Sequence, residues 1–160
     1  MTAPVPAPVT TNGRVKVANY ASNPNSQGYP EPSVSFNSVL SSPWHPLDGR
    51  IFYDWIPTNR WTSFDSGNPT DWYSLNFGPG RAKNISQVKL YVYSDVATNE
   101  GRVDCPTKME VEIYNGSSWI PATNQRFTPE KCSPNDVTLI DFDSVITQQV
   151  RVIFTRDVTN

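Results

Sequence analysis

The stretch Ile85-Ser86-Gln87-Val88-Lys89-Leu90-Tyr91-Val92-Tyr93 decides the class of fold, because it is the longest run in the chain with a repeat of two. From Val88 onward, aliphatic residues occupy every second position, and polar or tyrosine residues fill the positions between them. Successive side chains of a β-strand point to opposite faces of a sheet. The stretch therefore predicts a strand with one face in a hydrophobic core and the other toward solvent.

Shorter apolar runs, separated by turn residues, lie on both sides of this stretch. No window of about twelve residues has apolar side chains at a helical period, so we expect essentially no helix. The turn Asn115-Gly116 predicts a hairpin between two of the runs. The predicted strands are residues 15–20, 34–36, 73–77, 85–93, 109–114, 119–121, 137–140 and 150–154. This succession is typical of an antiparallel sandwich or barrel.

The length and charge of the chain narrow the classes of protein. A chain of 160 residues fits one domain. Its 13 basic and 15 acidic residues form no basic stripe, so we expect no nucleic-acid partner. No uninterrupted apolar stretch approaches the roughly 20 residues that a membrane span needs.

Residues 1–13 differ from the rest because proline alternates there with small residues. Such a segment favours an extended conformation and offers little to bury, so it reads as a linker or N-terminal extension. A linker implies that another domain is attached. We assign residues 14–160 to the β-sandwich module.

Cys105 and Cys132 are the two cysteines of the chain, and no metal-ligand pattern surrounds either of them. One disulfide is the favoured interpretation, and two buried free thiols in a cytosolic protein are the alternative. The sequons at Asn84 and Asn115 favour the oxidising compartment. We therefore expect a secreted, extracellular protein.

Three fragments occur in a fixed order between residues 47 and 78: Leu47-Asp48-Gly49-Arg50, Asn59-Arg60-Trp61-Thr62-Ser63 and Asp71-Trp72-Tyr73-Ser74-Leu75-Asn76-Phe77-Gly78. This order resembles the discoidin-like, or coagulation-factor C-type, domain. Later fragments agree with it, namely the stretch from Ile85, Gly101-Arg102-Val103, residues 108–119 and residues 150–155. The resemblance implies a galactose-binding-like fold, an eight-stranded antiparallel jelly-roll sandwich, and extends to family 32 carbohydrate-binding modules.

The same resemblance implies a structural calcium ion held by Asp48 and Asn59 together with backbone carbonyls. Oxygen ligands of this kind suit calcium, which takes about six to eight of them. The sequence departs from the family pattern in its long insertion, residues 50–58, and in lacking the acid of the last strand, where only Asp157 lies near. Without calcium, Asp48 caps a turn.

A sugar site needs a flat aromatic ring for C–H faces and planar polar groups for hydroxyls. Residues 50–58 place Phe52, Tyr53 and Trp55 in a turn region where all three cannot be buried, so we expect at least one to be exposed. The trio is either a sugar platform or a lid over the end of the sandwich. The candidate ligand-binding residues, the last five of them implied by the resemblance, are Tyr53, Trp55, Thr62, Phe64, Tyr93, Asp95 and Arg102.

Several neighbouring residues have structural interpretations. Arg102 could pair with Asp95 or Asp104 instead of touching a ligand. Trp61 and Trp72 are predicted to pack in the core, with the guanidinium of Arg60 flanking an indole and pairing with an acid.

Catalysis has little support. His45 is the only histidine, and its neighbours indicate a packed turn. Glu110 with Glu112, and Asp141 with Asp143, are predicted to be solvated faces of strands and not hydrolytic pairs. We expect a monomeric, non-catalytic carbohydrate-binding module that targets an attached glycoside hydrolase or polysaccharide lyase. The alternative is a protein- or phospholipid-binding adhesion domain.

Overall fold

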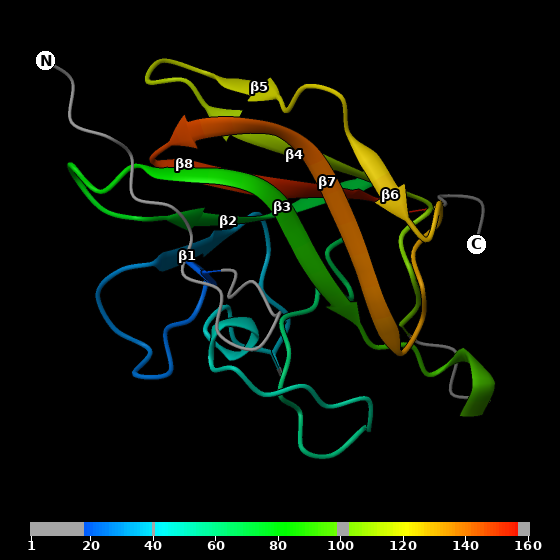
Figure 1. Cartoon of the computed structure of the whole chain (residues 1–160). Helices are drawn as coiled ribbons and strands as arrows, with labels where there is room; N and C mark the ends of the chain where they lie inside the picture. Colours follow the sequence, from blue (N-terminus) through cyan, green and yellow to red (C-terminus); the bar gives the residue numbers. More distant parts are fainter. Residues whose placement is uncertain (1–17, 40, 99–102, 157–160) are drawn as a thin grey trace, which may run out of the picture.

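The computed structural model describes residues 18–39, 41–98 and 103–156, which form two antiparallel β-sheets (Figure 1). The five-stranded sheet has, in spatial order, β1 (Glu31–Val34), β2 (Thr70–Asn76), β8 (Gln149–Thr155), β4 (Lys108–Tyr114) and β5 (Trp119–Pro121). The three-stranded sheet has β3 (Lys83–Val92), β7 (Asp136–Thr147) and β6 (Arg126–Thr128). Two 3-10 turns, η1 (His45–Leu47) and η2 (Val96–Thr98), complete the regular structure of the described residues. The predicted all-β sandwich is confirmed.

Most predicted strands are found, with shifted ends. The alternating stretch forms β3, and the hairpin around Asn115-Gly116 joins β4 to β5. The prediction for residues 15–20 falls partly outside the described residues, and residues 18–20 lie in no strand. Sequence reasoning missed β6 and ended β7 seven residues too early, because Asp141 and Asp143 interrupt the apolar run on the exposed face of β7.

The core lies between the sheets and follows the alternation of the strands. Met109, Val111 and Ile113 on β4 face Ile140 and Phe142 on β7. Val111 and Ile140 are fully buried. Further core residues are Phe77, Ala122, Val150 and Val152. Glu110 and Glu112 occupy the positions between the buried residues of β4, so the outer face of this sheet is the polar one.

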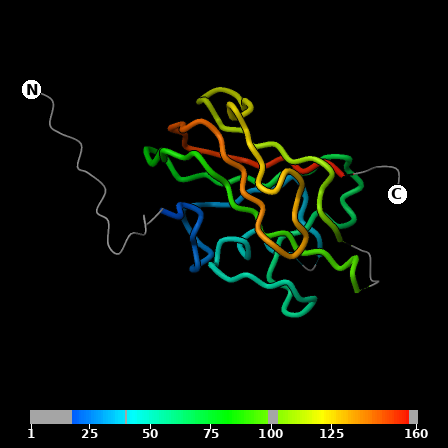
Figure 2. The backbone as a smooth tube through the Cα atoms, turned by 45° about the vertical axis from the view of Figure 1, so that its right-hand side comes forward, coloured from blue at the N-terminus to red at the C-terminus, as the bar shows by residue number. Residues whose placement is uncertain are grey.

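Long connections gather at one end of the sandwich, where β3 ends and β7 begins. We call this region the loop end and define it as residues 35–39, 41–69, 93–98, 103–107 and 129–135. Figure 2 shows the cyan segment of residues 50–60 at the bottom of the molecule, away from the yellow-green β4–β5 hairpin at the top. Over the described ranges, no helix is long and apolar enough to cross a membrane.

Candidate functional site

Trp61 fixes the long connection between β1 and β2 against the sheet. Its indole Nε1 donates a hydrogen bond to the Phe36 carbonyl oxygen at 2.8 Å. Its ring centroid lies 5.5 Å from that of Tyr73 and 5.7 Å from that of Phe154. Trp61 thus packs against the sheet, but it is half-buried and lies outside the core cluster, so the prediction of core packing holds only in part. The packed indole holds the neighbouring Arg60 at the loop end.

Arg60 lies between two aromatic rings. Its Cζ is 5.2 Å from the centroid of Trp55 and 4.4 Å from that of Tyr93, both within cation–π range. We call these three residues the Arg60 clamp. Arg60 Nη1 donates to the Asp54 carbonyl oxygen at 3.2 Å. The predicted pairing of Arg60 with an acid is therefore wrong, because the described residues offer its guanidinium aromatic faces and a backbone oxygen instead.

The aromatic trio of residues 50–58 is divided between solvent and the protein. Trp55 is 41% exposed, so the expectation of at least one exposed aromatic is confirmed. Phe52 and Tyr53 are half-buried. Burial raises the pKa of the Tyr53 phenol, and the nearby Asp136 and Tyr91 raise it further. Tyr53 is therefore a neutral hydroxyl at physiological pH, able to donate or accept a hydrogen bond.

The loop end also contains an open cavity of about 430 Å³, which we call the loop-end pocket. Thr62 and Phe64 line it as predicted site residues, and Phe64 is 38% exposed. The remaining lining residues are Ser63, Asp65, Gly67, Val103, Asp104 and Arg156. The pocket thus combines one aromatic face with carboxylates and a guanidinium, the combination that a sugar ring requires.

The clamp and the pocket share their supporting backbone. Arg60 is two residues before Thr62, whose backbone N–H donates to Ser41 Oγ at 3.2 Å. Tyr93 precedes Ser94, whose hydroxyl donates to Asp104 Oδ1 at 2.9 Å. A ligand held by both parts would therefore contact two connections that meet at the loop end.

Asp71, which sequence reasoning did not single out, anchors the rim of the pocket. Its side chain is 3% exposed and accepts hydrogen bonds from Ser35 Oγ at 2.6 Å, Ser66 Oγ at 2.6 Å and Asn68 Nδ2 at 3.0 Å. Burial opposes the charge of this carboxyl, but the side-chain hydrogen bonds outweigh burial and lower its pKa. The signal available in the sequence was an acid at a strand start preceded by Ser and Asn.

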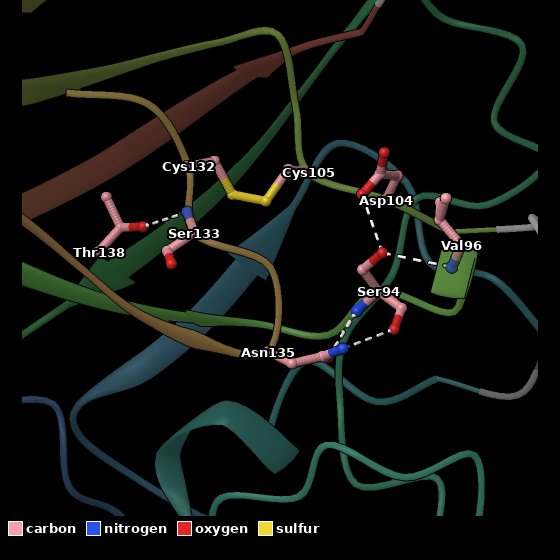
Figure 3. The surroundings of a disulfide bond; sticks show 8 residues. All are labelled: Ser94, Val96, Asp104, Cys105, Cys132, Ser133, Asn135 and Thr138. Carbon is pink, nitrogen blue, oxygen red and sulfur yellow. Dashed lines mark hydrogen bonds between the residues drawn. A yellow bond between two sulfur atoms is a disulfide. The ribbon is translucent and has the colours of Figure 1, made fainter. Parts of the chain in front are cut away.

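A second anchor is the network around the disulfide (Figure 3). Cys105 is bonded to Cys132, which confirms the disulfide interpretation. Asn135 accepts from the Ser94 backbone N–H at 2.9 Å and donates to the Ser94 carbonyl oxygen at 2.9 Å. These links tie Ser94 and Cys105 to the connection that precedes β7.

Asp95, which the resemblance implies as a ligand contact, is buried and bonded to backbone. It is 1% exposed, and its Oδ1 accepts from the Val103 backbone N–H at 3.0 Å. This bond joins Asp95 to the backbone on the other side of the same connection, and Asp95 is not among the residues that line the pocket. Arg102 and the Gly101-Arg102 turn lie outside the described residues.

Asp48 and Asn59 lie together, as the calcium interpretation requires. Asp48 Oδ1 accepts from the Arg50 backbone N–H at 2.8 Å and lies 3.4 Å from Asn59 Nδ2. No group of three or more metal-binding His, Cys, Asp or Glu side chains occurs in the described residues. Calcium takes about six to eight oxygens, so backbone carbonyls would have to supply most of them beside these two side chains. The bond from the Arg50 backbone N–H also fits the alternative, in which Asp48 caps a turn.

Thermal unfolding in calcium and in chelator tests this assignment. A bound ion would raise the unfolding midpoint as free calcium increases. We expect no such rise, and we expect Asp48→Ala to lower stability by about 1 kcal/mol in both solutions through loss of the turn hydrogen bond. A calcium-dependent midpoint that Asp48→Ala abolishes would instead establish the metal site.

The acids considered for catalysis have structural partners. His45 opens the η1 turn, as expected of a packed turn. Arg151 Nε donates to Glu112 Oε2 at 2.6 Å, so the prediction of a solvated Glu112 is wrong. Lys108 pairs with Glu110, Gln87 donates to Asp141, and Asn124 donates to Asp143.

The prediction that Trp72 packs in the core is wrong. Trp72 lies on the outer face of its sheet against Arg151, because it alternates with Tyr73 on β2.

Solved structures match the fold of this chain, and several of them are carbohydrate-binding modules. A chain of the Streptococcus pneumoniae beta-galactosidase BgaA matches with a TM-score of 0.78 at 18% identity, covering 89% of this chain and 92% of that one. Chitosan-binding module 1 of a Paenibacillus sp. IK-5 chitosanase/glucanase matches with a TM-score of 0.61 at 18% identity, over 89% and 90% of the two chains. No family model and no curated protein matches the sequence.

A third match is the family 32 module CpGH89CBM32-5 of Clostridium perfringens, in complex with GalNAc-β-1,3-galactose. Its TM-score is 0.54 at 12% identity, over 81% of this chain and 86% of that one. At these identities the likeness establishes the fold. The chain is a β-sandwich of the galactose-binding-like type, and the resemblance to discoidin-like and family 32 domains is confirmed at that level.

Proposed function

We propose that this chain is a carbohydrate-binding module whose site is the loop end. The observation that carries the proposal is the exposed indole of Trp55, held beside Arg60 and Tyr93. An indole face packs against the C–H face of a sugar, and the neighbouring Tyr53 and Arg60 can hydrogen-bond to its hydroxyls. The carbohydrate ligands named for structurally similar chains support the same class of ligand.

The module acts by proximity and not by chemistry in this proposal. The acids considered for hydrolysis have structural partners, and an open site with one stacking ring gives modest affinity. Tethered through residues 1–13 to a glycoside hydrolase or polysaccharide lyase, the module would raise the concentration of that enzyme at its substrate. The disulfide supports the proposal that the protein is secreted, and we further propose that it is a monomer.

A glycan array followed by calorimetric titration of the best ligand tests the site. Trp55→Ala removes the exposed stacking face, and we expect the dissociation constant to rise about tenfold to a hundredfold. The matched control is Trp119→Ala on β5, because Trp119 also stacks on an arginine, at 4.6 Å from Arg151, but lies away from the loop end. Equal losses in the two variants, or no glycan bound by the wild type, would refute the proposal.

One observation favours the adhesion alternative. Ile51 and Ile56 flank Trp55 on the same connection and are 50% and 76% exposed. Apolar side chains of this kind can insert into a lipid interface. Co-sedimentation with neutral and anionic liposomes separates the two functions. A sugar site with Arg60 as its nearest cation predicts that the protein does not pellet with either kind of liposome. Strong pelleting of the wild type that is lost in Ile56→Ser would favour adhesion.

A further inference from the structure

Two arginines of this chain each lie between a pair of aromatic rings, and they differ in one respect. Arg151 Cζ is 4.6 Å from the Trp119 centroid and 5.8 Å from the Trp72 centroid, on the outer face of the five-stranded sheet. The Arg60 clamp has the same arrangement at the loop end, with Trp55 and Tyr93 as the rings. The acceptor that Arg151 binds therefore indicates what kind of group Arg60 could bind.

A carboxylate occupies the guanidinium edge in the Arg151 pair. Arg151 Nε donates to Glu112 Oε2 at 2.6 Å, and Nη2 contacts the same oxygen. The Arg151 and Glu112 side chains are only 20% and 14% exposed. With its two faces covered by rings, a guanidinium can bind an acceptor only along its edge, and there a carboxylate is the matching partner.

In the Arg60 clamp, no carboxylate of the described residues occupies that edge. Arg60 has five N–H donors, and its one hydrogen bond in the described structure is from Nη1 to the Asp54 carbonyl oxygen. Asp54 contributes its backbone, and Asp136 acts on Tyr53 without forming an ion pair with Arg60. A half-buried guanidinium flanked by rings is partly desolvated, so an incoming anion interacts with it more strongly than with a fully exposed arginine.

We propose that the Arg60 clamp is an anion subsite that takes the carboxylate of a uronic acid residue in an acidic glycan. In this arrangement the carboxylate binds the edge of Arg60 as Glu112 binds Arg151, and the pyranose ring packs on the exposed face of Trp55. The inference rests on the proposed carbohydrate-binding function and specifies its ligand class. A sulfate ester offers a similar anion, but the comparison within the chain is with a carboxylate.

Titration with an oligouronate and with the same oligosaccharide after carboxyl reduction tests the proposal. The two ligands differ only in charge and in one oxygen per residue, so the ratio of their dissociation constants isolates the carboxylate. We expect the wild type to bind the acidic form at least about tenfold more tightly. Equal affinities for the two forms would overturn the proposal.

Two substitutions locate the effect at Arg60. Arg60→Gln should bring the ratio close to one, and Arg60→Lys should recover little of it, because a lysine lacks the planar edge that binds a carboxylate through two bonds. The matched control is Arg126→Gln, since exposed Arg126 also donates Nη1 to a backbone carbonyl, that of Asn124, but lacks the ring pair. A ratio reduced equally in Arg60→Gln and Arg126→Gln would overturn the proposal as a general charge effect.

The outcomes separate this inference from the proposed function. Trp55-dependent binding of neutral and acidic glycans with equal affinity would leave the function in place and remove the anion subsite. Binding of no glycan would remove both. Arg60-dependent preference for a sulfated oligosaccharide over the oligouronate would overturn the carboxylate assignment. Circular dichroism and the thermal midpoint establish whether each variant is folded. If Arg60→Gln does not fold, Arg60→Lys provides the test.

Discussion

Replacing Asp71 by alanine should destabilise the protein by about 3 to 5 kcal/mol, because three side-chain donors then lose a buried charged acceptor. Ser35 follows β1, and Ser66 and Asn68 precede β2, so the carboxylate connects the two ends of the β1–β2 connection. Ser35 Oγ also accepts from the Trp72 backbone N–H at 2.9 Å, so the network links two adjacent strands. Urea unfolding at neutral pH measures the loss.

The pH dependence of stability gives a second signature of the same carboxyl. Its pKa is lowered from the ordinary 3.8 in the folded state, so between the folded and unfolded pKa values the unfolded state binds more protons. The contribution is therefore complete above about pH 4 and is lost as the pH falls through the folded pKa. Asp71→Asn keeps the shape of the side chain and should remove this part of the acid destabilisation.

An exposed carboxyl provides the control for both measurements. Asp143 is exposed and accepts a single side-chain hydrogen bond, from Asn124 Nδ2 at 2.8 Å. Asp143→Asn should change stability by no more than about 0.5 kcal/mol at any pH. If Asp71→Asn had the same acid-unfolding curve as the wild type, or if Asp71→Ala cost under about 1 kcal/mol, Asp71 would not be the anchor described above.

The same anchor bears on the proposed site, because Ser63, Phe64 and Asp65 line the pocket just before Ser66. An Asp71 variant that remains folded should bind ligand more weakly through loosening of this rim. Part of the binding free energy would then be used to order this connection.

The sheets could be predicted from the sequence because their cause is local. The repeat of two in β3 and β4 is an alternation of apolar and polar side chains within each strand. It can be read from the sequence whatever the conformation of the loops. The strand β6 was missed since three residues are too few to show a period. The outward position of Trp72 was missed since composition favours burying an indole, whereas the register of β2 with β8 decides which face it takes.

The loop end could be predicted less well because its geometry depends on contacts far apart in the sequence. Phe52, Tyr53 and Trp55 were identifiable as a crowded aromatic segment, and Trp55 is indeed exposed. That Arg60 lies against Tyr93, thirty-three positions away, follows only from the packing of the connection beside the end of β3. Asp95 is a ligand contact only by resemblance to the family pattern, and its burial and its bond to the Val103 backbone N–H could not be predicted from that pattern.

The loop end therefore has two kinds of support, one for each connection that meets there. Asp71 holds residues 62–69 from the side of β2 through a buried charge. The disulfide holds Cys105, and Asn135 holds Ser94, from the side of β7. Since Tyr93 of the clamp adjoins the second connection, the proposed ligand contacts depend on both supports, but the two respond to different conditions, namely pH and reducing agent.

Opening the disulfide should lower the free energy of unfolding by about 3.5 kcal/mol, because Cys105 and Cys132 are 27 positions apart and their bond restricts a chain segment of that length in the unfolded state. Urea unfolding of the oxidised protein, the reduced protein and the Cys105→Ser, Cys132→Ser double variant measures this, and reductant should not affect the double variant. We expect glycan affinity to fall as well, at a temperature where all three forms are folded, since Asn135 alone then ties Ser94 to the β7 side. Undiminished affinity in the double variant would mean that the disulfide contributes to stability and not to ligand binding.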